Sequence, residues 1–184
     1  MMTGSSANRR TLLFSMLALG STAAVAHPAT GADAASRVSL QVRVGGRVQR
    51  EVLLTPETLG DFAKAPITDT PLRGRSGDTL RVLSGYGGIR LSDLLDKAQI
   101  LAKDHNDLKK TIIVATATDD YKAVFSWNEL YNTAVGEGVY VLVTKESKPL
   151  GDEEGRFALI SLQDSKTGPR HVRWLIDIRA SLVE

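Results

Sequence analysis

The residue types that carry most protein chemistry are scarce in this chain. Its 184 residues include no cysteine, so no thiolate can act as a nucleophile, a metal ligand or half of a disulfide. The three histidines, His27, His105 and His171, are scattered and do not predict a metal site. We expect His171 to face solvent, because it alternates with the apolar Val172. No glycine-rich phosphate loop, zinc-protease helix or nucleophile elbow occurs either.

Four arginines lie close together in the sequence: Arg73, Arg75, Arg81 and Arg90. This group could bind a small anion or could simply belong to a solvated loop, and the sequence alone leaves both interpretations open. Over the whole chain, 23 basic residues face 21 acidic ones. A charge so nearly balanced gives no electrostatic basis for binding nucleic acid or an anionic membrane surface.

Four short segments follow one another in a recognisable order. They are residues 86–95 (YGGIRLSDLL), 118–126 (TDDYKAVFS), 153–157 (EEGRF) and 170–178 (RHVRWLIDI). Together they resemble the molybdopterin-binding domain of the sulfite oxidase-type oxidoreductases, especially the short exported members that consist of little else. The resemblance covers roughly residues 80 to 180. It implies the fold of that domain and a pterin or molybdopterin-like ligand.

The chain departs from this family at the residues that hold the metal. The oxidases place a metal-binding cysteine in the segment that corresponds here to 73–84, and this chain has none. Serine or arginine cannot replace a thiolate as a soft ligand for molybdenum. The family's phosphate-binding arginine corresponds to Ala158, with Arg156 two positions earlier. The resemblance therefore implies a pterin site without a metal.

Residues in the matching segments could still bind a pterin ring. The 2-amino and N3–H donors of the ring suit a single carboxylate, for which Asp119 is the candidate. Its flat face needs aromatic partners, for which Tyr121 and Trp174 are the candidates, with Tyr86 behind them. Three arginines could contact the pterin carbonyl, a hydroxyl or a phosphate: Arg156, Arg170 and Arg173.

Each candidate also has a purely structural explanation. Trp174 lies in an apolar strand pattern and could be a core or sheet-edge aromatic. Tyr121 could pack beside a turn, and Asp119 could bond only to the backbone of that turn. Asp120 stands where the family has a turn glycine, and aspartate tolerates the left-handed conformation that such a turn needs. Trp127 opens a short helix and is expected in the core.

The elements expected to position these residues are short strands and helices. Alternation over 38–44, the pair Gly45-Gly46 and a second run ending at Leu54 predict a β-hairpin on a two-glycine turn. A short helix is expected over 55–63, and a long loop over 64–78.

The remaining pattern mixes strands and helices without strict βαβ order. Leu91, Leu94, Leu95 and Ala98 share one face of a helix that Ser92 would cap. The segment 111–117 is apolar on both faces, which predicts a buried central strand. Other expected strands are 80–83, 122–126, 139–144, 157–162 and 172–178, with a helical turn at 127–132. This arrangement predicts an α+β fold, a mixed β-sheet with short helices.

The first 26 residues predict an export signal. Arg9 and Arg10 precede a mostly apolar stretch, and cleavage is expected after Ala26. The paired arginines fit either a twin-arginine signal or an ordinary secretory signal. Removing the signal would leave 21 basic residues, two fewer than 23, against 21 acidic ones. Residues 27–36 are expected to form a flexible leader, and 37–184 a single domain.

Taken with the resemblance, these features predict a non-catalytic, periplasmic pterin-binding protein. Its short exported relatives imply a ligand-dependent partner for the periplasmic domain of a membrane sensor protein, and neither nucleic-acid binding nor membrane insertion is expected. The alternative is a molybdenum-cofactor-dependent redox enzyme or subunit that lacks the cysteine ligand. A third interpretation is a scaffold that has lost its pocket and uses the 64–78 segment as a protein contact.

Overall fold

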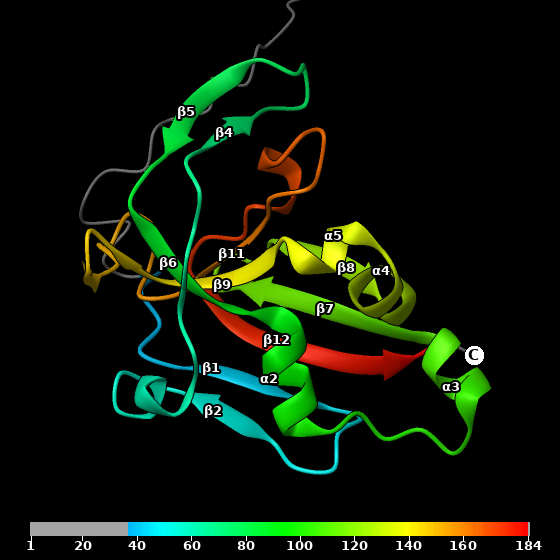
Figure 1. The fold of residues 1–184 in the computed structure, drawn as a ribbon. Helices are drawn as coiled ribbons and strands as arrows, with labels where there is room; N and C mark the ends of the chain where they lie inside the picture. The colour runs from blue at the N-terminus through cyan, green and yellow to red at the C-terminus, as the bar shows by residue number, and fades with distance from the viewer. Residues whose placement is uncertain (1–36, 184) are drawn as a thin grey trace, which may run out of the picture.

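The structure is a computed structural model that describes residues 37–183, and three β-sheets organise them (Figure 1). The predicted export signal (1–26) and leader (27–36) lie outside the described residues. Parallel and antiparallel pairings occur together, and the helices are short, so the described chain has the α+β character that the sequence predicts. No helix in this part of the chain is long and apolar enough to cross a lipid bilayer.

The first sheet joins the beginning and the end of the described chain. Its strands, in order, are β2 (Val52–Leu54), β1 (Val42–Gly46), β12 (Leu175–Leu182), β7 (Thr111–Ala117) and β8 (Lys122–Ser126). The central β12 pairs in parallel with β1 and antiparallel with β7. β7 buries every second residue, so the expectation that both of its faces are fully buried is wrong. β7 and β8 are joined by the turn that carries Asp119 and Tyr121.

The second sheet is antiparallel and is built around β9. It contains β10 (Lys148–Pro149), β9 (Val139–Lys145), β6 (Tyr86–Arg90) and β3 (Ala65–Pro66) in that order, and β11 (Ala158–Ser161) also pairs with β9. Alternate side chains of β9 enter different cores. Val141 and Val143 belong to the main hydrophobic cluster between the sheets, whereas Leu142 packs with Tyr86 in a second cluster.

A two-stranded hairpin extends away from both larger sheets (Figure 1). It consists of β4 (Thr70–Arg73) and β5 (Thr79–Leu83), paired antiparallel. The sequence prediction of a long loop over 64–78 is therefore wrong, since this segment contains both β3 and β4. Pro66 and Pro71 obscure the strand pattern, but proline is tolerated in short edge strands such as these. Leu72, in β4, is buried.

Short helices and 3₁₀ turns complete the described chain. They are η1 (Thr58–Asp61), α2 (Leu91–Ala98), α3 (His105–Lys109), α4 (Trp127–Asn132), α5 (Ala134–Glu137) and η2 (Gly168–Arg170). Helix α2 packs against strands of both larger sheets. The predicted apolar face of α2 is confirmed, because its leucines and Ala98 are buried. Its N-cap is Arg90 and not Ser92, since β6 runs directly into the helix. Trp127 is only partly buried and stacks on Tyr131 at the edge of the core.

Several predicted boundaries move because tertiary pairing overrides local signals. Gly45 and Gly46 continue β1 beside β12, so they do not form the predicted two-residue hairpin turn. The helix expected over 55–63 is reduced to η1. The strand expected from residue 172 begins only at Leu175, because Trp174 adopts a left-handed backbone conformation (φ 53°) that interrupts it.

Candidate ligand-binding site

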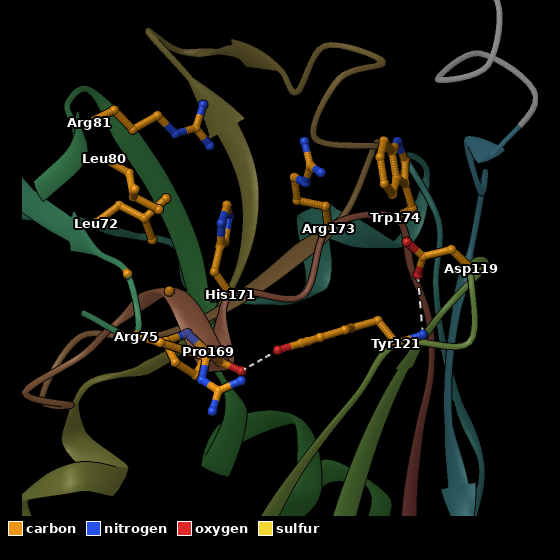
Figure 2. A pocket seen from close by; sticks show the side chains of 12 residues that line it. Leu72, Arg75, Leu80, Arg81, Asp119, Tyr121, Pro169, His171, Arg173 and Trp174 are labelled. Atoms are coloured by element: carbon orange, nitrogen blue, oxygen red, sulfur yellow. Dashed lines mark hydrogen bonds between the residues drawn. The ribbon is translucent and has the colours of Figure 1, made fainter. Parts of the chain in front are cut away.

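A cavity of about 610 Å³ lies where the β4–β5 hairpin, the β7–β8 turn and the segment 168–174 meet (Figure 2). Its volume falls within the roughly 300–1,000 Å³ range of small-molecule sites. The hairpin supplies Leu72, Gly74, Arg75, Leu80 and Arg81, and the other two segments supply Asp119, Tyr121, Gly168, Pro169, His171, Arg173 and Trp174. Four of the seven residues predicted to bind a pterin therefore line one cavity: Asp119, Tyr121, Arg173 and Trp174.

The β7–β8 turn fixes Asp119 and Tyr121 in the cavity. Asp120 takes the left-handed conformation (φ 64°) that the sequence comparison predicts at this position. Asp119 Oδ1 accepts a hydrogen bond from the Tyr121 amide at 3.2 Å, so the carboxylate does bond its own turn. Oδ2 has a longer contact of 3.8 Å with Arg37 Nη1. Asp119 also lines the cavity.

Tyr121 is fixed by one hydrogen bond from its backbone and one from its hydroxyl. Its amide donates to Asp119, and its hydroxyl donates to the carbonyl of Pro169 at 2.6 Å. Figure 2 shows the side chain stretched between these two partners along the cavity. The residue is nevertheless 44% exposed. A fixed aromatic side chain that remains this accessible can stack on a flat ligand.

Trp174 is buried and also lines the cavity. It is 3% exposed, and its Nε1 donates to the carbonyl of Asp152 at 2.8 Å. The guanidinium of Arg173 lies 4.4 Å from the ring centroid, and that of Arg37 lies 5.2 Å away. The indole therefore supports two cations by cation–π interaction. The indole is thus a buried packing residue that also lines the cavity.

A buried ionic cluster lies beneath the hairpin end of the cavity. Glu154 Oε1 pairs with Arg81 Nη2 and lies 3.4 Å from the hydroxyl of Tyr86. Glu154 Oε2 lies 3.0 Å from His171 Nε2, and both side chains are almost completely buried. The His171 side chain is 5% exposed, so the expectation that it faces solvent is wrong.

The cluster keeps Glu154 ionised. Burial alone would raise the pKa of this carboxyl, but the close contact with His171 and the pairing with Arg81 outweigh it and lower the pKa to about 2. Burial, together with the neighbouring Glu154 charge, raises the pKa of the Tyr86 hydroxyl. Tyr86 is thus part of the cluster and not of the cavity wall, where the sequence had placed it as a stacking partner.

Two of the predicted arginines lie outside the cavity wall. Arg156 pairs with Asp152 at 3.4 Å. Arg170 is held by Asp164 and by Glu129, the latter at 2.7 Å, and lies over the ring of Phe125. Arg170 therefore connects the end of η2 to α4, which is a structural role.

Sequence reasoning did not assign Arg75, Arg81, Glu154 and His171 to this site. The sequence did point to the arginines near residue 75, because an anion-binding site was one of the two interpretations of that group. Glu154 and His171 gave no signal, since a buried pair 17 positions apart in loops has no periodicity to reveal it. No group of three or more acidic or histidine side chains within residues 37–183 is placed to hold a metal ion.

Comparison with known proteins gives a relationship of fold. No family model and no curated protein matches this sequence. Solved structures do match, among them the sulfane dehydrogenase SoxCD from Paracoccus pantotrophus, with a TM-score of 0.55 at 17% sequence identity. The match covers 78% of this chain and 39% of the SoxCD chain. The described chain is therefore distantly similar in fold to part of a dehydrogenase.

Proposed function

We propose that the protein binds a pterin in this cavity and acts through binding, without catalysis. The observation that carries the proposal is the β7–β8 turn, which fixes a carboxylate and an accessible aromatic ring side by side in one cavity of suitable size. A pterin needs this combination, because one edge of the ring presents two donors and its faces are flat.

Two comparisons support the same class of protein. The four ordered sequence motifs resemble the molybdopterin-binding domain of sulfite oxidase-type oxidoreductases, and the fold is similar to part of a sulfane dehydrogenase. Both point toward proteins of redox chemistry. The chain nevertheless has no cysteine, so it offers no thiolate to molybdenum. This is why we propose a binding protein and not an enzyme.

The donor set of the cavity fits a pterin. Asp119 would accept hydrogen bonds from the 2-amino group and N3–H, and Tyr121 would stack on the ring. Arg173, held against the indole of Trp174, would donate to the pterin carbonyl. Each of these roles uses a group that the structure already holds in place by a hydrogen bond or a cation–π contact.

The setting of this function is part of the proposal. The export signal predicted from the sequence supports a periplasmic location, where ligand binding would control association with the periplasmic domain of a membrane sensor protein. The β4–β5 hairpin suits such a role, because it both lines the cavity and extends from the body of the protein with Leu80 and Val82 exposed.

A pair of neighbouring substitutions tests the carboxylate. Asp119→Asn should weaken pterin binding roughly 10- to 100-fold, because it replaces a charge-assisted bidentate acceptor with a neutral group. Asp120→Asn is the matched control, since its side chain is 95% exposed and asparagine also tolerates a left-handed backbone. Quenching of pterin fluorescence, titrated with purified protein, measures both affinities.

Two results would overturn the proposal. Calorimetry that detects no binding of reduced or oxidised pterins would exclude a pterin site. Stoichiometric molybdenum in protein purified from its native host would instead favour the alternative, a cofactor-dependent redox enzyme or subunit without the cysteine ligand.

A further inference from the structure

The two ends of the cavity have opposite chemistry. In Figure 2, Asp119 lies on one side, while Arg75, Arg81 and His171 lie toward the hairpin on the other. The Asp119 end offers an acceptor and an aromatic face, which the proposed pterin ring uses. The hairpin end offers the cationic side chains of Arg75 and Arg81 to the cavity, and a pterin ring bound at the Asp119 end does not use them.

The donors at the hairpin end are free to bind a ligand. Arg81 uses one Nη2 donor on Glu154, and its side chain is still 43% exposed, so further N–H groups remain available. His171 also lines the cavity, but its Nε2 lies 3.0 Å from Glu154 Oε2, so it helps to hold that carboxylate and leaves the arginines as the donors for a ligand. Arg75 is exposed and forms no ion pair with any described residue.

The surroundings leave these arginines available to an anion. Leu72 and Leu80 line the cavity beside them and carry no charge. Glu154 balances only part of the local positive charge, and it lies buried behind Arg81 and His171, where it holds both in place. Glu154 is thus a positioning residue, and Arg75 and Arg81 line the cavity.

We propose that the hairpin end of the cavity is an oxyanion subsite, in which Arg75 and Arg81 bind a carboxylate or phosphate group carried by the ligand. This inference rests on the proposed function for the identity of the ring. The ligand is then a pterin with an acidic substituent. Its orientation is fixed, because Asp119 attracts the donor edge of the ring and repels the acid.

The test compares two pterins that share a ring and differ in one substituent. Calorimetry with the full chain should show that 6-carboxypterin binds about tenfold or more tightly than 6-hydroxymethylpterin, the gain expected from charge-assisted hydrogen bonds. Arg75→Gln and Arg81→Gln should reduce this ratio toward one. Arg179→Gln, in β12 outside the cavity, should leave the ratio unchanged.

The use of both Arg75→Gln and Arg81→Gln separates a loss of binding from a folding defect. Arg81→Gln leaves Glu154 with one partner fewer and could destabilise the protein, whereas Arg75 is exposed and unpaired among the described residues, so its substitution should leave the fold intact. Equal affinity for the two pterins, unchanged in Arg75→Gln, would overturn the subsite while leaving the pterin proposal standing.

Inorganic phosphate separates failure of the subsite from failure of the proposed function. If neither pterin binds, the proposed function fails, but phosphate binding that weakens in Arg75→Gln would still support the subsite. If phosphate does not bind either, the subsite is overturned as well. Phosphate that lowers the affinity for 6-carboxypterin, but not for 6-hydroxymethylpterin, supports both proposals.

Discussion

Two carboxylates at this site have opposite environments, and the difference assigns them different roles. Asp119 lies at the cavity with one oxygen bonded to its own turn and the other beside the cavity. Glu154 is buried, paired with Arg81 and in contact with His171. A ligand can therefore use the charge of Asp119, whereas the charge of Glu154 serves the protein itself.

The pairing of Glu154 should make stability depend on pH in the acid range. Its pKa is about 2 in the folded protein against 4.5 for an ordinary glutamate, so its contribution is complete above pH 4.5 and is lost as the pH falls toward 2. The shift corresponds to about 3 kcal/mol. Glu154→Gln should lower the free energy of unfolding at neutral pH and flatten its slope between these pH values, as measured by urea unfolding.

Glu153→Gln provides the control for that measurement, because Glu153 is adjacent in sequence but exposed. It should keep the slope of the parent protein. A slope that persists unchanged in Glu154→Gln would show that another group is responsible for it.

The fixed ring of Tyr121 gives a second prediction at the residue scale. Tyr121→Leu should weaken pterin binding by about 5- to 150-fold, since aromatic stacking on a base contributes roughly 1–3 kcal/mol. Tyr121→Phe keeps the ring but loses the bond to Pro169, so its affinity should fall only slightly. Fluorescence titration distinguishes the two, and equal losses would show that the hydroxyl, and not the ring, matters.

At the scale of elements, the loop before β11 determines the shape of the cavity through Trp174. The Trp174 amide donates to the Glu154 carbonyl at 2.8 Å, and Gly155 follows with φ +78°. A Cβ at Gly155 would lie 2.8 Å from the Cα of Trp174, which no real side chain tolerates. The loop and the strand entrance can approach this closely only because residue 155 is glycine.

Gly155→Ala should therefore destabilise the protein by roughly 1–3 kcal/mol and weaken ligand binding at the same time. Gly60→Ala is the matched control, because no atom lies within 4 Å of the added Cβ and the backbone there is ordinary. Its free energy of unfolding should stay within about 0.5 kcal/mol of the parent. A Gly155→Ala protein of normal stability and affinity would mean that the close contact is easily relieved.

The elements also show where sequence reasoning succeeds. The amphipathic face of α2 and the alternation of β8 are local patterns, and both are found as predicted. The sequence does not reveal β4 and the β4–β5 hairpin, because β4 contains a proline and β5 has mostly exposed side chains. Neither strand shows the apolar alternation of a strand that packs on a core. The apolar run of β7 suggested burial on both faces, but only one face packs against the main core.

At the scale of the whole molecule, the cavity exists only because distant segments meet. The hairpin, the β7–β8 turn and the segment before β12 come from three separate parts of the chain. The sequence could place Asp119 and Tyr121 together because they share one turn. It could not place Arg81, Glu154 and His171 together, because their contact depends on how the sheets assemble.

A ligand that joins three segments should stabilise the whole fold. At a pterin concentration of 100 times Kd, the gain is about 2.7 kcal/mol, which for a protein of this size raises Tm by roughly 5–10 °C. Asp119→Asn should show a much smaller shift at the same concentration. Thermal unfolding followed by circular dichroism measures both, and equal shifts would place the ligand elsewhere.

The position of Trp174 has an optical consequence. The chain has two tryptophans, and the other, Trp127, is stacked on Tyr131 in α4, outside the cavity. Trp127→Phe would leave a single emitter in the wall of the cavity, close enough to a bound pterin to transfer its excitation energy. The protein thus carries its own donor for following ligand arrival in real time, without an attached dye.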